Sequence, residues 1–283
     1  MAASGKAADR AGAPVNGSGG VALFRRAVVG GRAAWRLVRS VGQALRGACV
    51  CAVVFPFVDA TARMRHVRDW SRAMLRVLGI ELRVSGPEMA GQALLVANHV
   101  SWLDILAINA IAPVRFVSKA DVRAWPVLGF MVARGGTLFI ERHRRRDALR
   151  VVHDVAEALR QGDRVAVFPE GTTGEGAEVL VFHANLMQAA IVTARPVQPV
   201  ALRYSDASSA FSAQAAYVGE TTLLASLWRV ATGERLQAHV AVLPLLDSQT
   251  ADRRSLAERA RTQIQAALDH APSVSTLNRR PQC

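Results

Sequence analysis

The sequence predicts an α/β fold with a mostly parallel sheet flanked by helices, preceded by an N-terminal amphipathic helical segment suited to membrane binding. From residue 80 onward, short β-branched runs alternate with stretches of helical periodicity, a pattern typical of βαβ units. Hydrophobic residues make up 51% of the 283 residues, which is enough for a sizeable core. Positive charge is concentrated before this region, so the two parts of the chain are expected to have different partners.

The α/β region is expected at residues 80–250, followed by a C-terminal helix and tail at 251–283. Its expected strands are 81–85, 93–97, 114–118, 137–140, 164–168, 197–204 and 240–245. Its expected helices are 102–111, 126–134, 147–161, 183–194, 221–231 and 250–270. No internal repeat is visible, so a repeat architecture is not expected.

The segment before this region is expected to form a tail and a membrane-association region. Residues 1–19 are rich in alanine, glycine and serine, lack the apolar core of a signal peptide, and are expected to be disordered. Residues 20–79 are expected to be helical and basic. They comprise an amphipathic helix at 20–46 that two adjacent glycines weaken, an apolar run at 48–58, and a second helix that ends at Gly79.

The charge distribution predicts an anionic partner for the N-terminal part. Residues 1–83 hold 14 Lys and Arg against 4 Asp and Glu, a net charge of +10 out of +13. The arginines alternate with aliphatic and aromatic residues, which suits an anionic membrane surface better than nucleic acid, although a solvated helix face gives a similar pattern. The apolar run contains Pro56, is bracketed by Arg46 and Asp59, and is too short to cross a bilayer. Membrane association without a spanning helix is therefore expected.

Several site classes are not expected. Cys49, Cys51 and Cys283 show neither metal-ligand spacing nor a disulfide framework, which predicts a reducing compartment and no metal site. The sequence contains no Walker A or G-x-G-x-x-G pattern, so no nucleotide cofactor is expected. It also lacks a G-x-S-x-G elbow, which argues against a serine hydrolase.

Residues 98–104 read NHVSWLD and place a histidine and an aspartate around a predicted strand-to-helix turn. His99 and Asp104 are then close enough to hydrogen-bond. A neutral imidazole can take a proton from a hydroxyl, and a carboxylate on its other nitrogen fixes the tautomer. Taken alone, the segment also fits a structural histidine, with Asp104 capping the helix in a capping-box pattern with Ser101.

Three further segments contribute to the pattern. Residues 164–173 read RVAVFPEGTT, in which a buried strand runs into a proline that stops the ladder and a glycine that permits a tight turn. Glu170 is thereby presented where open α/β sheets bind ligands, although a plain turn with a solvated glutamate would look similar. Residues 136–142 read GTLFIER and deliver a cation at a strand end, and Pro199 lies near the start of a later strand.

These four segments, in this order and at this spacing, resemble the four motifs of the glycerolipid acyltransferase family, of the lysophosphatidate acyltransferase type. The family motifs have the forms NHxSxxD, GxxFIxR, FPEGT and a strand with a proline, and the resemblance covers about residues 60–250. It implies an α/β acyltransferase fold with an N-terminal membrane-binding part. It also implies transfer of a fatty acyl group from acyl-CoA or acyl-carrier protein to a lysolipid hydroxyl, without a cofactor, at the cytoplasmic face of the inner membrane.

The resemblance implies a role for each motif residue. His99 is expected to be the general base and Asp104 the carboxylate that orients it. The residues expected to bind the acceptor are Arg142, which would hold its phosphate, Glu170, Gly171 and Thr172. Lys119 matches a lysine often found near the reacting carbonyl, where a cation would stabilise the oxyanion of the tetrahedral intermediate.

Two departures from the family pattern concern the acceptor. Thr173 stands where many lysophosphatidate enzymes have an arginine, and His183 stands where a basic residue usually follows the phenylalanine. Both changes remove positive charge, as in a branch that includes lyso-ornithine lipid acyltransferases. We expect 1-acyl-sn-glycerol-3-phosphate as the acceptor, with lyso-ornithine lipid as the alternative. A non-catalytic membrane or nucleic-acid binder is a remote alternative, because all four motifs are intact.

Overall fold

The structure, a computed structural model, describes residues 17–125, 127–140 and 145–270 and is built around a seven-stranded sheet. The strand order over these residues is β1-β7-β6-β2-β5-β3-β4, and every neighbouring pair is parallel except the antiparallel pair β6–β7. The strands are β1 (Glu81–Ser85), β2 (Leu94–Ala97), β3 (Arg115–Lys119), β4 (Leu138–Ile140), β5 (Val165–Val167), β6 (Val197–Ser205) and β7 (Gln237–Val242). The predicted fold class is confirmed.

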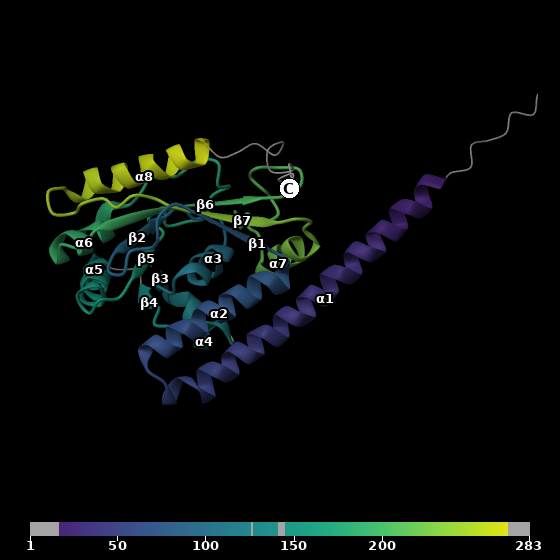
Figure 1. Cartoon of the computed structure of the whole chain (residues 1–283), viewed down its shortest axis with the longest axis horizontal. Coiled ribbons are helices and arrows are strands. Elements are labelled where there is room, and N and C mark those ends of the chain that lie inside the picture. The colour runs from purple at the N-terminus through teal and green to yellow at the C-terminus, as the bar shows by residue number, and fades with distance from the viewer. Residues whose placement is uncertain (1–16, 126, 141–144, 271–283) are drawn as a thin grey trace, which may run out of the picture.

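Helices cover both faces of the sheet (Figure 1). Helices α2 (Ala60–Leu78) and α3 (Leu103–Ile111) pack on one face, and α5 (Arg145–Arg160), α6 (Met187–Thr193) and α8 (Arg253–Asp269) pack on the other. The remaining helices are α1 (Gly17–Val53), α4 (Leu128–Arg134), α7 (Leu223–Thr232) and the short 3₁₀ turns η1 (Phe55–Phe57), η2 (Ala120–Ala124) and η3 (Ala184–Leu186). Two hydrophobic clusters result, one on each side of the sheet.

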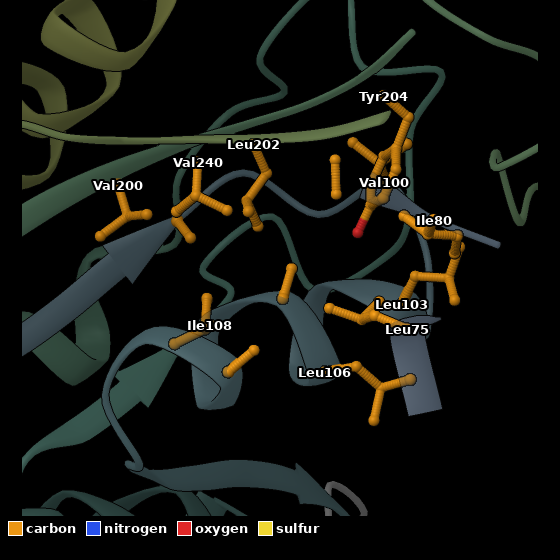
Figure 2. Packing of buried hydrophobic residues seen from close by; sticks show 14 of the residues in the cluster. Leu75, Ile80, Val100, Leu103, Leu106, Ile108, Val200, Leu202, Tyr204 and Val240 are labelled. Atoms are coloured by element: carbon orange, nitrogen blue, oxygen red, sulfur yellow. The ribbon is translucent and has the colours of Figure 1, made fainter. Parts of the chain in front are cut away.

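Strand β2 lies in the middle of the sheet and is buried on both sides. Leu95 and Ala97 belong to the cluster under α2 and α3, whereas Leu94 and Val96 belong to the cluster under α5, α6 and α8. This double burial explains why the strand is apolar throughout. Figure 2 shows the first cluster, in which side chains of α3 meet those of β6 and β7. The segment that follows β2 is therefore held by the best-buried part of the molecule.

Most predicted element boundaries agree with the structure within three residues, and the last strand is the main shift. The strand was expected at 240–245, but β7 spans Gln237–Val242. Beyond β7 the chain stays beside β6 through other bonds: Leu243 N–H donates to the Pro199 carbonyl, and Leu246 forms a bridge with Val197. Leu246 is thus buried without extending the strand, whereas Leu245 is 50% exposed.

Helix α1 is continuous from Gly17 to Val53, contrary to the expectation of a helix at 20–46 separate from an apolar run at 48–58. Between Ala33 and Cys51 its buried positions are seven, three, four and four residues apart, so one face of this part of the helix docks on the protein, and this packing outweighs the weak propensity of its glycines. These positions are Ala33, Ser40, Gln43, Gly47 and Cys51. Residues 17–19 of the expected tail are helical, whereas residues 1–16 and 271–283 lie outside the described residues.

Direct contacts fix α1 to the rest of the protein. The Arg36 guanidinium donates to the carbonyls of Ala231 and Gly233, at 3.0 and 2.9 Å, at the end of α7. The Trp70 indole of α2 donates to the Gln43 carbonyl at 2.8 Å. A Cβ at Gly47 would overlap Trp70, so this glycine permits the close approach of α1 and α2.

The expectation that no segment is long enough to span a membrane is wrong for α1. The stretch Ala27–Phe57, which runs from α1 into η1, has 31 residues, and an 18-residue window within it has a mean hydropathy of 1.4, which suffices by length and composition. The sequence interpretation began the apolar run after Arg46, although a single arginine does not exclude a spanning helix. Only 28% of the apolar window is buried inside the protein, so most of its surface is exposed.

Strands β6 and β7 share a polar pair next to the core. Ser205 Oγ lies 2.8 Å from His239 Nε2. Burial, followed by the positive charges of Arg203 and Arg83 on the neighbouring strands, lowers the pKa of His239 from 6.5 to about 4. His239 is therefore neutral in the folded protein at pH values where an unfolded chain would protonate it.

We expect this histidine to make the fold acid-sensitive. As the pH falls from 6.5 to about 4, His239 becomes protonated in the unfolded chain but stays neutral in the folded protein, so the folded state loses stability across this range. His239→Gln removes the titrating group while keeping a partner for Ser205. Thermal unfolding across this range should therefore depend less on pH in the variant than in wild type. His153→Gln, which removes an exposed histidine on α5, is the control, and equal pH dependence in all three proteins would contradict the prediction.

Candidate active site

The site lies where β2 and β5 end at the same edge of the sheet. Because these strands are parallel neighbours, the segments that follow them lie close together. His99 comes two residues after β2, and Glu170 comes three residues after β5. The two meet directly, since His99 N–H donates to Glu170 Oε2 at 2.8 Å.

His99 and Asp104 form a hydrogen-bonded pair. Asp104 Oδ2 lies 2.7 Å from His99 Nδ1. A carboxylate accepts hydrogen bonds, so Nδ1 carries the proton and Nε2 is left to accept one. The Asp104 side chain is fully buried, whereas 21% of the His99 side chain is exposed. The pair therefore combines a fixed carboxylate with an imidazole that a substrate can reach.

Asp104 also shapes the turn that carries His99. Its Oδ2 accepts the backbone N–H groups of Val100 and Ser101, at 2.7 and 2.9 Å. The bond to Ser101 N–H is one half of a capping box, but the buried Ser101 hydroxyl has no partner among the described residues, so the other half is not formed. Asp104 thus contacts the histidine and holds the helix start, and the two interpretations of the sequence are compatible.

Side chains and loops hold this turn from both sides. The Asn98 amide exchanges two hydrogen bonds with the backbone of Leu202 on β6, at 2.9 and 2.8 Å. The carbonyl of His99 accepts the Gly174 N–H at 2.7 Å, and the carbonyl of Val100 accepts the Tyr217 N–H at 3.0 Å. The backbone around His99 is therefore fixed by three separate segments of the chain.

An aromatic stack sets the plane of the His99 ring. The Phe168 ring lies 4.0 Å from the imidazole, with an interplanar angle of 11°. Phe168 in turn stacks on Phe116 of β3, with centroids 5.8 Å apart. The phenylalanine of the FPEGT segment thus supports the imidazole through its face, while Asp104 holds it through its edge.

Glu170 is buried and fully engaged with the backbone. Its Oε1 accepts Leu180 N–H at 2.9 Å, in addition to the bond that Oε2 makes with His99 N–H, and the residue is 6% exposed. Burial raises the pKa of Glu170 above its usual range, against the lowering effect of these two N–H groups. Glu170 therefore braces the histidine turn. The acceptor-binding role that the resemblance implies for it stays a prediction.

The other predicted site residues lie around this centre. Gly171 has a φ of 72°, which favours glycine at this turn, and Thr172 is exposed beside it. Lys119 ends β3, two strands along the same edge from β2, and its side chain is exposed. Strand spacing places β3 roughly 10 Å from β2. Arg142 lies outside the described residues, two positions after the end of β4.

Thr173 and His183, the departures from the family pattern, have structural contacts. The Thr173 hydroxyl donates to the Tyr217 carbonyl, which ties the FPEGT loop to the loop after β6. His183 N–H donates to the Pro169 carbonyl at 2.9 Å. The same loop carries two exposed carboxylates, Glu175 and Glu178, so its described part is acidic.

The sequence interpretation gave no role to three residues of the site, two of which lie within its motifs. Tyr204 Oη donates to Asp104 Oδ1 at 2.8 Å, Asn98 clamps β6, and Phe168 supports the imidazole. A signal existed for Tyr204, because it lies in a fully buried strand and a buried phenol needs a hydrogen-bond partner. The identity of that partner could not be read from the sequence.

The chain was compared with known proteins. The acyltransferase family profile matches residues 80–203. A lyso-ornithine lipid O-acyltransferase from Pseudomonas aeruginosa is 41% identical over 214 residues, covering 75% of this chain and 82% of the relative. A 1-acyl-sn-glycerol-3-phosphate acyltransferase from Neisseria meningitidis is 37% identical over 210 residues, covering 73% and 82%.

The fold also has a solved counterpart. The crystal structure of the 1-acyl-sn-glycerophosphate acyltransferase PlsC from Thermotoga maritima superposes with a TM-score of 0.60 at 18% identity. The match covers 87% of this chain and the whole of that chain. At this identity the likeness concerns the fold alone.

His99→Ala should lower catalytic turnover by several orders of magnitude while leaving the protein folded, because no other described group occupies the position of the imidazole. Asp104→Asn should also be damaging, since an amide cannot accept from the imidazole and two backbone N–H groups as a carboxylate does. Its loss of turn stabilisation alone would cost about 0.5–2 kcal/mol of stability. Turnover and melting temperature should be measured on the same samples. His99→Ala turnover within tenfold of wild type would remove His99 from this role.

Proposed function

Because the chain belongs to the acyltransferase family, we propose that it moves a fatty acyl group from acyl-CoA or acyl-carrier protein to the hydroxyl of a lysolipid. The observation that carries this proposal is the His99–Asp104 pair, with Nδ1 and Oδ2 2.7 Å apart at the carboxyl edge of the sheet. Its free Nε2 is a general base, and acyl transfer to an alcohol requires one.

The proposed reaction proceeds as one acyl transfer. His99 Nε2 takes the proton of the acceptor hydroxyl while its oxygen attacks the thioester carbonyl. Asp104 stabilises the imidazolium that forms. The tetrahedral intermediate then collapses, the carbon–sulfur bond breaks, and the thiolate leaves with the proton that His99 returns. The products are the acylated lipid and the free thiol of the carrier.

A cation near the carbonyl would stabilise the negative charge of the intermediate. Lys119 is the proposed source, since it lies exposed at the same sheet edge as His99. The ammonium is on a flexible stem, so it can reach the oxyanion when both substrates are bound. Thr172, exposed at the turn after β5, and Gly171 beside it are the proposed contacts for the acceptor.

The proposed acceptor is 1-acyl-sn-glycerol-3-phosphate, which would give phosphatidate. Relatives with this activity in their names support it, and Arg142 supplies a cation for the phosphate. A second acceptor, lyso-ornithine lipid, is favoured by one specific observation. The loop beside His99 has Thr173 tied to a carbonyl, and it presents Glu175 and Glu178 to solvent. Such a loop suits a headgroup without a phosphate.

The proposed place of action is the surface of an anionic membrane, at the cytoplasmic face of the inner membrane. The face of α1 opposite to its docked face carries an apolar stripe: Val28, Trp35, Val38, Val41, Leu45 and Val53, each at least 54% exposed. Arg39 and Arg46 are exposed beside the stripe, where they would meet anionic headgroups. Because the other face is bonded to α7 and α2, we propose that α1 lies in the interface instead of crossing the bilayer.

Replacing Val38 and Val41 by glutamate together should lower affinity for anionic vesicles at least tenfold, because charges then replace apolar contacts in the bilayer surface. Wild-type binding should weaken with salt yet leave a residual apolar component. Vesicle sedimentation over a salt series measures both effects. Leu149→Glu, at a 73% exposed apolar residue on α5, is the matched control. Equal loss in the control, or no loss in the double variant, would contradict the assignment of α1.

The acceptor is tested with Thr173→Arg, and with Thr173→Val as the control that loses the same hydroxyl without gaining charge. If the acceptor carries a phosphate, the arginine should lower its KM by roughly tenfold or more, since a charge-assisted contact contributes about 1.5–3 kcal/mol. Arg142→Ala should raise the same KM. Initial rates with a labelled acyl thioester on lysophosphatidate and lyso-ornithine lipid give these values. Wild-type protein that acylates only lyso-ornithine lipid, with activity lost in Thr173→Arg but kept in Thr173→Val, would replace the first acceptor by the second.

A further inference from the structure

Tyr204 is a buried phenol whose hydroxyl reaches the carboxylate of the catalytic pair. It is the penultimate residue of β6 and is 2% exposed. Figure 2 shows its hydroxyl within the apolar cluster, near Val100. Within the described part of the chain its hydroxyl donates to Asp104 Oδ1, at 2.8 Å, on a residue one hundred positions away in the sequence. The phenol hydroxyl of Tyr204 thus lies in the apolar core and makes its polar contact with the active site.

The bond completes the coordination of Asp104. Oδ2 accepts from His99 Nδ1, Val100 N–H and Ser101 N–H, whereas Oδ1 accepts from Tyr204. Asp104 is fully buried, so no solvent can replace the phenol. Four donors at fixed positions hold both oxygens, and therefore the plane of the carboxylate, in one orientation toward the imidazole.

The backbone of β6 is placed so that this contact forms. Asn98 fixes Leu202 against the end of β2 through two hydrogen bonds. Tyr204 follows two residues later and therefore projects from the same face of the sheet as Leu202, toward α3. Asp104 lies in the first turn of α3. The Asn98 clamp thus sets the strand register that brings the phenol to the carboxylate.

We propose that Tyr204 is a positioning residue for acyl transfer, which acts through Asp104 on His99. The hydrogen bond from Tyr204 fixes the plane of the Asp104 carboxylate, which orients the imidazole. It also withdraws part of the negative charge of Asp104, so that the carboxylate stabilises the protonated imidazole less strongly. This proposal rests on the proposed function for its kinetic part, whereas its effect on the His99–Asp104 pair exists in the protein without substrate.

The phenol keeps its proton under assay conditions. Burial, followed by the negative charge of Asp104, raises the pKa of Tyr204 well above 10. The titratable groups that face the imidazole from the elements around it are Asp104 from α3 and Glu170 from the loop after β5. Tyr204 from β6 acts on it through Asp104 and remains a donor while the histidine titrates.

Tyr204→Phe tests the proposal, because it keeps the ring in the core and removes only the donor. We expect kcat to fall roughly tenfold or more, as for the loss of one charge-assisted hydrogen bond, with the KM of both substrates unchanged. The Asp104 carboxylate becomes a stronger acceptor without the phenol and favours the protonated imidazole. The acidic limb of the pH profile of kcat should therefore move to higher pH.

Ser248→Ala is the matched control, since Ser248 is also buried and its hydroxyl also makes a hydrogen bond, with the Arg195 carbonyl, outside the site. It should lower thermal stability without changing kcat or the pH profile. The titration of His99 followed by NMR in substrate-free protein should move to higher pH in Tyr204→Phe and stay at the wild-type value in Ser248→Ala. This measurement does not depend on the reaction, so it separates failure of this proposal from failure of the proposed function. An unchanged titration and an unchanged kcat in Tyr204→Phe, whatever its melting temperature, would overturn the positioning role.

Discussion

The site depends on one buried carboxylate with four donors around it. Asp104 accepts from an imidazole, two backbone N–H groups and a phenol, and it is fully shielded from water. A buried charge is tolerated only when hydrogen bonds satisfy it, so the four donors together allow Asp104 to be buried. The turn at His99, the start of α3 and the end of β6 therefore form one unit, which Glu170 extends to the loop after β5.

Local patterns predicted most of this protein. Alternating apolar runs and helical segments gave the order and type of the sheet elements, because hydrophobic periodicity is a short-range property. The His99–Asp104 pair could also be predicted from the sequence, since the two residues are five positions apart on either side of one turn. The contacts of Tyr204 and Asn98 with their partners span one hundred residues or more, and no local pattern identifies such partners.

Helix α1 shows why a charged residue misled the interpretation. Arg46 limits the expected apolar run on its N-terminal side, but in the structure it is an exposed residue within a helix that spans Gly17–Val53. The helix is held together by docking, through residues that are small or polar on its inner face, such as Gly47 and Gln43. Amphipathicity relative to the rest of the protein, and not mean hydropathy, decides how such a helix is used.

The clamp between Asn98 and Leu202 has a consequence for folding. The bond from His99 to Asp104 closes a short loop, whereas the bonds from β6 that fix it are among the most non-local in the site. Non-local contacts carry the larger loop-closure cost and form only when the sheet assembles. During synthesis, a chain that has not yet extended past β6 lacks the groups that orient the base. The catalytic pair is therefore oriented only once the centre of the sheet is complete.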